Sequence, residues 1–179
     1  MNVQQQDIPR FEKEWESIIK SNATEANKDA IDAYTAAVGK AINQMLRGNG
    51  SDLIQGWDTK LLTKWSEQCS NLFDRVKTTE PLVLYRCVNK GKFLPDIGKS
   101  FVDKGFVSCS IKPQMQFGNV LIEYRVPQGV RGGYIKSLSD QAYENEFLLD
   151  KNQKCVIFGK KKVEISGEIF DCYVVEVQK

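Results

Sequence analysis

The spacing of apolar residues changes near residue 80, and this change limits the fold more than any other feature of the sequence. Before it, apolar side chains recur at intervals of three and four, which predicts amphipathic helices over residues 11–19, 31–46 and 61–76. Gly48 and Gly50 are predicted to end the second helix. After it, short segments rich in β-branched and aromatic residues predict strands over residues 82–88, 105–109, 120–126, 133–136, 146–150, 154–158, 161–165 and 169–177.

Helices followed by strands, with no internal repeat or low-complexity linker, predict a single α+β domain spanning residues 1–179. Residues 1–79 would form its helical portion and residues 80–179 its β-rich portion. A chain of 179 residues is long enough for one sizeable hydrophobic core.

The chain contains no histidine, which excludes Ser-His and Cys-His nucleophile mechanisms and the usual imidazole metal sites. Acid-base chemistry must then fall to carboxylates, lysine, tyrosine or cysteine. The cysteines are odd in number and scattered, without a CxxC pair, so we expect buried free thiols and no bound metal. They are Cys69, Cys87, Cys109, Cys155 and Cys172.

Charge and hydropathy limit the partners. The net charge is +2, and Lys160, Lys161 and Lys162 resemble the solvated face of a hairpin, so no nucleic-acid partner is expected. There is no apolar run of 18 residues and no basic-then-apolar start, so we expect neither a membrane span nor a signal peptide in this chain. The protein would be cytosolic, injected into another cell, or a mature secreted form.

Two carboxylates lie two residues apart at the start of an apolar run. On a strand, Glu144 and Glu146 would share one face, roughly 6 to 7 Å apart, with Phe147 and Leu149 on the other. The pattern fits a catalytic pair, but a half-solvated surface strand gives the same alternation.

Arg86 lies within the first predicted strand, on the same face as Leu84 and Val88. A permanent cation on an apolar face needs an anionic partner or a route to solvent. One possibility is that the Arg86 guanidinium pairs with a protein carboxylate or extends to solvent. The other is that its planar guanidinium binds a ligand phosphate.

Ser108 and Ser110 share one face of the next predicted strand with Phe106. Serine favours turns over strand interiors, so this pair indicates either a cleft wall or an ordinary strand end.

The order of Arg86, then Ser108 and Ser110, then Glu144 and Glu146 resembles the toxin-type mono-ADP-ribosyltransferases with an Arg, Ser, Glu signature. The likeness is greatest to the clostridial Rho-modifying exoenzymes and the enzymatic components of binary actin-modifying toxins. It covers residues 30–177, and further similar segments are Tyr34 to Arg47, Pro127-Gln128-Gly129, Gly133-Tyr134-Ile135 and residues 146–151.

This resemblance implies two packed β-sheets that meet at a cleft and are flanked by helices. It implies that the protein binds NAD as a co-substrate, without a metal, and transfers ADP-ribose to a protein side chain with release of nicotinamide. Glu146 matches the catalytic glutamate and Ser108 would orient it. The chemistry agrees with this assignment of Glu146. Breaking the bond between nicotinamide and ribose forms an oxocarbenium-like sugar, which a fixed carboxylate stabilises.

The resemblance also assigns the nucleotide site. Arg86 would clamp the pyrophosphate, and backbone groups beside Cys87 would bind the nicotinamide amide. Tyr34, Asn43 and Arg47 match positions on the family's helix that line the nucleotide site. The alternative is that they belong to an ordinary helix face, with Tyr34 packed in the core.

Ser110 and Phe117 complete the predicted NAD-binding set. The family usually has an arginine three residues after the aromatic, and here Val120 stands in its place. Lys112 is a candidate to supply part of the missing charge.

Glu144 indicates the acceptor. In the family, a glutamate at this position accompanies arginine as the target, and a carboxylate is suited to orienting and deprotonating a guanidinium. The loop from Leu138 to Tyr143 would contact the target protein, with Gln141 at the aligned aromatic position and Tyr143 as the recognition aromatic.

We therefore predict a monomeric toxin or effector that is secreted or injected and modifies arginine on a host or competitor protein. Two alternatives are an NAD glycohydrolase, in which water replaces the acceptor, and a catalytically weakened interaction module of the same fold.

Overall fold

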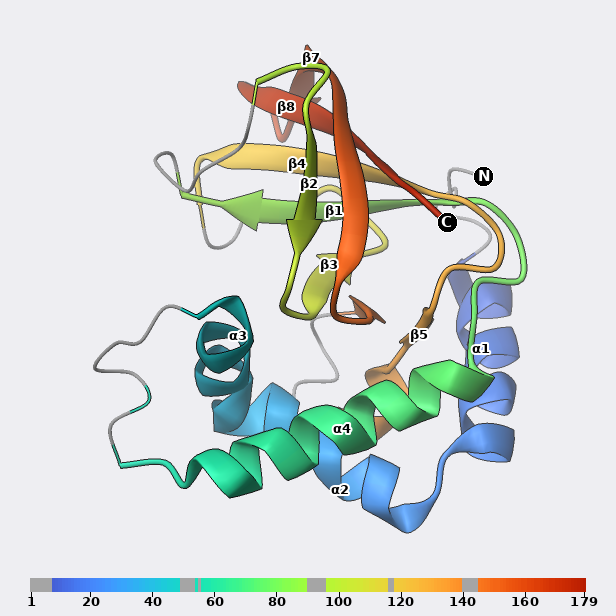
Figure 1. Ribbon diagram of the computed structural model, residues 1–179. Coiled ribbons are helices and arrows are strands. Elements are labelled where there is room, and N and C mark those ends of the chain that lie inside the picture. Colours follow the sequence, from blue (N-terminus) through green and yellow to red (C-terminus); the bar gives the residue numbers. More distant parts are fainter. Residues whose placement is uncertain (1–7, 49–53, 55, 90–95, 116–117, 140–144) are drawn as a thin grey trace.

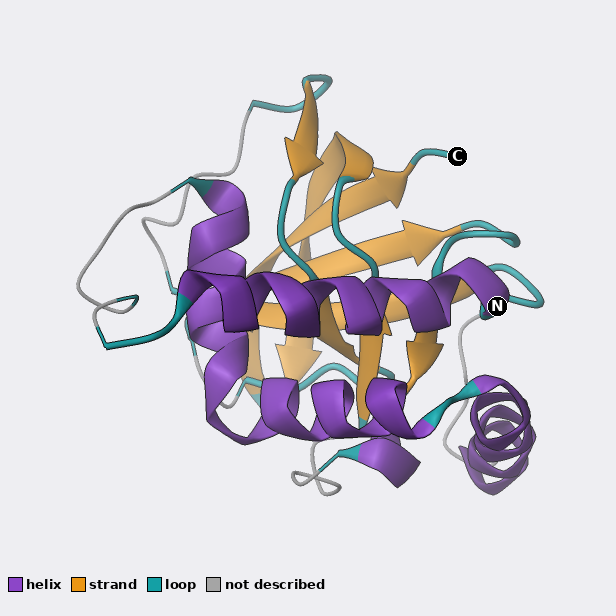
Figure 2. Ribbon diagram, turned by 60° about the horizontal axis from the view of Figure 1, so that its bottom comes forward, coloured by secondary structure: helices purple, strands orange, loops and turns teal. Residues whose placement is uncertain are grey.

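The computed structural model describes residues 8–48, 54, 56–89, 96–115, 118–139 and 145–179, and its helices lie together on one side of the strands (Figure 1, Figure 2). All α-helices precede the first strand among these residues, as the change of spacing near residue 80 predicts. The helical elements are α1 (Ile8–Asn22), α2 (Glu25–Ala33), η2 (Tyr34–Val38), α3 (Gly39–Arg47), α4 (Thr59–Arg75) and the short 3-10 turn η3 (Lys136–Leu138).

The second predicted helix is interrupted by a π-helical turn. Residues 25–47 form α2, η2 and α3 without a break in the helical backbone. Gly48 ends α3 in a left-handed conformation (φ 71°), as predicted, whereas Gly50 lies outside the described residues. A β-carbon on Gly39 would lie 2.6 Å from the Tyr34 carbonyl oxygen, so this wide turn requires glycine there.

The eight strands form one hydrogen-bonded sheet in the order β2-β7-β8-β4-β1-β3-β6-β5. Only β4 and β8 run parallel among these neighbouring pairs. The strands are β1 (Leu82–Val88), β2 (Ser100–Asp103), β3 (Val107–Ser110), β4 (Val120–Val126), β5 (Gly132–Tyr134), β6 (Glu146–Leu149), β7 (Gln153–Ile165) and β8 (Glu168–Val177).

The junction between β1 and β3 divides this sheet into two parts. Its register consists of one residue pair, Tyr85 with Ser110. The strands β2, β7, β8, β4 and β1 lie on one side of the pair, and β3, β6 and β5 on the other. The resemblance implies two packed sheets, whereas the structure has one hydrogen-bonded sheet whose two parts meet at this single pair.

Most strands lie where the sequence predicts them, with two differences. β1 and β4 occupy the predicted residues, but segments 154–158 and 161–165 are one strand, β7. β2 was not predicted: it is four residues long at the edge of the sheet, and Val102 is half exposed, so its pattern carries little apolar signal.

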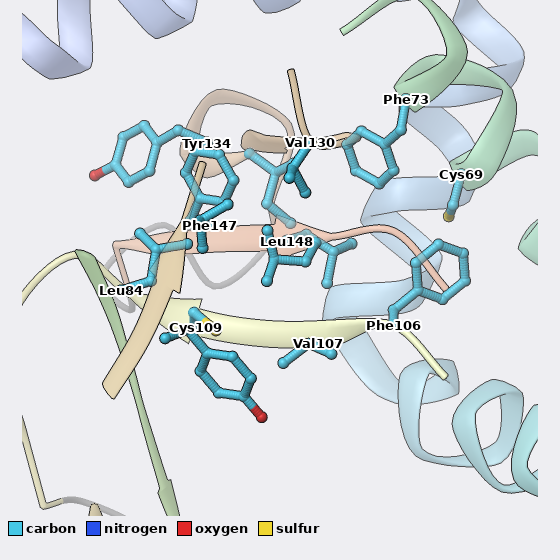
Figure 3. Close-up of a cluster of buried hydrophobic side chains, with 14 of the residues drawn as sticks. Cys69, Phe73, Leu84, Phe106, Val107, Cys109, Val130, Tyr134, Phe147 and Leu148 are labelled. Carbon is cyan, nitrogen blue, oxygen red and sulfur yellow. The ribbon is translucent and has the colours of Figure 1, made fainter. Parts of the chain in front are cut away.

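The main core lies between the helices and the strands (Figure 3). Phe106 has no exposed surface, and its ring centroid lies 5.5 Å from Tyr34 and 6.5 Å from Phe73. Phe106 precedes β3, so these contacts fix the start of that strand against α4 and η2. Figure 3 shows Cys69 and Phe73 of α4 beside Phe106.

All five cysteines are free, and four are buried, in agreement with the sequence prediction; Cys87 is partly exposed. No helix in the described part of the chain is long and apolar enough to cross a membrane.

Candidate active site

Arg86 lies in β1 and is partly buried, and its buried Nη1 has no hydrogen-bond partner among the described residues. The pairing of β1 with β4 sets Arg86 opposite Ile122 and Leu84 opposite Tyr124. Arg86 therefore shares a sheet face with Leu84 and Tyr124, as the period of two predicts. A buried cationic donor without a partner costs roughly 1–3 kcal/mol or more, so the position is suited to an anionic ligand.

The groups that act on the Arg86 charge are Tyr124, Cys109, Tyr34 and Asp103. Burial lowers the pKa of Arg86, but Tyr124, Cys109 and Tyr34 act against burial, and the net direction is upward. Burial raises the pKa of the Tyr34 and Tyr124 hydroxyls, so both are neutral at physiological pH. The carboxylate among these neighbours is Asp103.

Asp103 is already paired with Arg47. Arg47 Nε donates to Asp103 Oδ1 at 2.9 Å and Arg47 Nη2 to Oδ2 at 3.1 Å. Arg47 Nη2 also lies 3.4 Å from the Phe106 carbonyl oxygen. Arg47 thus has a structural role that joins α3 to β2 and to the residue before β3, and its predicted contact with phosphate remains a prediction.

Tyr34 and Asn43 connect the interrupted helix to the sheet. Asn43 Nδ2 donates to the Tyr34 hydroxyl at 2.8 Å, while Asn43 Oδ1 accepts from the Phe106 N–H at 2.7 Å. A β-carbon on Gly105 would lie 2.6 Å from Asn43 Oδ1, so glycine permits this close approach. The Tyr34 side chain packs in the core, and the charges of Glu146 and Arg86 act on its hydroxyl.

Glu146 is the first residue of β6 and is 4% exposed. Burial raises the pKa of Tyr34, Glu146 raises it further and Arg86 lowers it. The same two charges act in opposite directions on the buried Cys109 thiol. Arg86 and Glu146, from strands 60 residues apart in the sequence, therefore act on the same hydroxyl and the same thiol.

The two serines lie beside Glu146 on β3. Ser110 is paired with Glu146 in the register and Ser108 with Leu148, so both serines share the sheet face of Glu146. Ser110 Oγ donates to the Lys112 carbonyl oxygen at 2.7 Å and accepts from the Lys112 N–H at 3.1 Å. Ser110 thereby stabilises the turn after β3, whereas Ser108 is partly exposed next to the glutamate.

Cys87 lies on the opposite face of β1 from Arg86. Its Sγ is 3.6 Å from Met115 Sδ, so its side chain contacts the segment after β3. The Asn119 N–H donates to the Val88 carbonyl oxygen, and a β-carbon on Gly118 would lie 2.3 Å from that oxygen. The end of β1 and the start of β4 thus approach each other closely where the nicotinamide contact was predicted.

Four predicted site residues, Phe117, Gln141, Tyr143 and Glu144, lie outside the described residues. Lys112 is exposed, and its charge contributes to lowering the pKa of Glu12 in α1. The described part of the chain contains no group of three or more Cys, Asp or Glu side chains that could hold a metal ion.

Sequence reasoning missed Tyr124, Asp103 and Cys109 as neighbours of Arg86. Tyr124 could have been recognised from the sequence as a candidate site residue, because it is a tyrosine on the apolar face of a predicted strand. Asp103 could not have been recognised from the sequence, since its strand was not predicted and its partner Arg47 is 56 residues away.

Comparison with known proteins gives concordant results. The chain matches the family model described as ADP-ribosyltransferase exoenzyme over residues 9–169. Mono-ADP-ribosyltransferase C3 of Clostridium botulinum D phage is 26% identical over 159 residues, covering 74% of this chain and 62% of the relative. The chain thus spans less than two thirds of that relative's length.

Two solved structures share the fold. Plx2a, an ADP-ribosyltransferase toxin from Paenibacillus larvae, superposes with a TM-score of 0.77 at 20% identity, covering 98% of this chain and 96% of that chain. BECa, an ADP-ribosylating toxin of a binary enterotoxin of C. perfringens solved with NADH, gives 0.81 at 14% identity, covering 99% of this chain and 50% of that chain.

Proposed function

The chain belongs to the ADP-ribosyltransferase exoenzyme family, and we propose that it cleaves NAD between nicotinamide and ribose and transfers the ADP-ribose to an arginine of a target protein. The family's activity supports NAD as co-substrate. The BECa structure contains the related dinucleotide NADH.

One observation carries this proposal: the buried Arg86 Nη1 has no hydrogen-bond partner in the described part of the chain. The nearby carboxylate, Asp103, is held by Arg47. The neutral hydroxyls of Tyr34 and Tyr124 cannot compensate a positive charge. A pyrophosphate supplies the missing acceptor together with a negative charge, and a guanidinium is well suited to bind it.

Glu146 provides the second requirement of the reaction. Breaking the bond to nicotinamide develops positive charge on the ribose, which a buried carboxylate stabilises more strongly than an exposed one. Glu146 is 4% exposed. Ser108, on the adjacent strand and the same sheet face, would orient the Glu146 carboxylate.

Glu144 supports arginine as the acceptor. A guanidinium is protonated at neutral pH and becomes a nucleophile only when a base removes its proton. Glu144 precedes Glu146 by two residues and supplies such a base. The segment from Leu138 to Tyr143, ahead of this pair, would contact the target protein.

The target would be a host or competitor protein that a secreted or injected monomer meets in the cytosol of another cell. Neither nucleic acid nor a membrane is part of this proposal.

Incubation of the protein with labelled NAD and a cell lysate, followed by mass spectrometry, tests the proposal. We expect ADP-ribosylated arginine with the wild type and none with Glu146→Gln, since loss of such an electrostatic partner costs about 3–4 kcal/mol in the transition state. Glu144→Gln should retain NAD hydrolysis and lose arginine modification.

Modification of another residue type would refute the arginine acceptor, and full turnover by Glu146→Gln would refute the assignment of the catalytic carboxylate. Hydrolysis of NAD without any modified protein would favour the glycohydrolase alternative.

A further inference from the structure

α1 is linked to the residues on both sides of Glu146. Its Trp15 packs edge-on against Phe147, with ring centroids 4.9 Å apart. Its Glu12 accepts a hydrogen bond from the Tyr134 hydroxyl at 2.8 Å, and that hydroxyl lies 3.1 Å from Asn145 Oδ1. One helix thus contacts Phe147 directly and Asn145 through one intervening side chain.

The alternation of a strand explains why these contacts spare Glu146. Neighbouring residues on a strand point to opposite faces, so the contact of Phe147 with α1 leaves Glu146 directed to the other side. Tyr134 is paired with Phe147 in the register, and Figure 3 shows the two rings next to each other. The face toward α1 carries the supporting side chains, and the opposite face carries the carboxylate with the serines of β3.

The support around Tyr134 is itself well fixed. The Lys136 ammonium lies 2.8 Å from the same Glu12 carboxylate oxygen. Burial raises the pKa of Glu12, but the bonds from Lys136 and Tyr134 outweigh it and the net direction is downward. Glu12 therefore remains an anionic acceptor at neutral pH. The Tyr134 ring also packs edge-on against Phe11, with centroids 5.4 Å apart.

Asn145 has a backbone conformation that needs support. Its φ is +51°, a left-handed conformation that asparagine adopts more readily than most residues but still at a cost. The next residue is Glu146, whose carbonyl oxygen accepts from the Ile135 N–H at 3.0 Å. The direction in which the chain enters β6 depends on this turn.

We propose that α1 is a positioning element for the catalytic glutamate: Glu12, acting through Tyr134, and Trp15, acting on Phe147, fix the backbone on both sides of Glu146. The inference rests on the proposed function, because it concerns the orientation of Glu146 toward NAD. Tyr134, Glu12 and Trp15 touch no reacting atom and act through Asn145 and Phe147.

Steady-state kinetics of NAD cleavage test this role. Tyr134→Phe removes only the hydroxyl, and we expect kcat to fall on the order of tenfold with KM for NAD unchanged, because small misplacements of a catalytic group reduce turnover strongly. Glu12→Ala should have a similar effect, whereas Glu12→Gln retains a side-chain oxygen for the Tyr134 hydroxyl and should restore most of the activity.

The Tyr134→Phe, Glu12→Ala double variant should lose no more than either single variant, because both changes break one chain of contacts. Tyr173→Phe, on β8, is the matched control and should keep wild-type kcat. A purely structural role would lower the melting temperature and leave kcat unchanged below it; that result, with an active wild type, would overturn the positioning role alone. A wild type that cleaves no NAD would overturn the proposed function together with it.

Discussion

Arg131 and Arg86 illustrate the difference between a side chain held for structure and one held for a ligand. Arg131 lies 2.7 Å from Asp74 and 3.0 Å from Asp150, and it also donates to Ser70. Arg86 Nη1 has no hydrogen-bond partner within the described residues. Groups left unsatisfied in the free protein reduce its stability and are retained where function requires them.

Arg86→Met is therefore expected to weaken NAD binding without destabilising the protein. The long apolar side chain fills a similar volume, and loss of a charged hydrogen bond worth about 1.5–3 kcal/mol corresponds to roughly a tenfold to hundredfold rise in Kd. Calorimetric titration with NAD and thermal unfolding of the free protein would measure both effects.

Arg131→Met is the matched control for that experiment. It removes the cation beside Asp150, a carboxylate that is 1% exposed, so the free energy of unfolding should fall on the order of 3 kcal/mol while NAD affinity is kept. If Arg86→Met destabilised the protein and left Kd unchanged, Arg86 would be a structural residue as well.

Residue type decided how much of the site the sequence alone could predict. Arg86 and Glu146 were recognisable because charged side chains are unusual on strands with apolar neighbours. Asn145 and Glu12 carried no such signal, since the role of each depends on Tyr134, which is 11 residues from one and 122 from the other. Contacts of this kind follow from the packed fold and not from local spacing.

Among the elements, those with a full apolar face were predictable and those defined by local geometry were not. β1 and β4 lie at the predicted residues because both are long and mostly buried. The π-helical turn η2 was missed, since apolar spacing over residues 31–46 is the same for a continuous helix as for an interrupted one. That turn places Tyr34 where its hydroxyl meets Asn43.

Gly39→Ala tests whether η2 needs glycine. In an ordinary helix this change is stabilising by about 1 kcal/mol. Here the added β-carbon would lie 2.6 Å from the Tyr34 carbonyl oxygen and 3.2 Å from its ring, so we expect a loss of roughly 1–3 kcal/mol in urea unfolding. Gly159→Ala, where a β-carbon meets no atom within 4 Å, should be close to neutral. A stabilised Gly39→Ala variant would show that the turn tolerates a side chain.

At the scale of the whole molecule, one ion cluster attaches the helical layer to the strands. Ser70 of α4 donates to Asp150, which directly follows β6, and Arg131 bonds to both. Asp150 Oδ1 is buried without a hydrogen-bond partner among the described residues. Burial raises the pKa of Asp150, and Arg131 only partly offsets it. The cluster therefore fixes the orientation of α4 at some cost in stability at neutral pH.

This cost predicts a pH dependence of opposite sign at two aspartates. The folded pKa of Asp150 is raised, so its contribution to stability is present below the unfolded pKa of about 3.9 and is lost as the pH rises through the folded value. Bonds from Lys162 and Lys160 lower the pKa of Asp171 to about 2, so its contribution is present above the unfolded pKa and is lost as the pH falls toward 2. Relative to wild type, the free energy of unfolding of Asp150→Asn should rise with pH above about 3.9, and that of Asp171→Asn should fall with rising pH between about 2 and 4. Urea unfolding at a series of pH values measures both differences, and slopes of the same sign would contradict the assigned burial of Asp150.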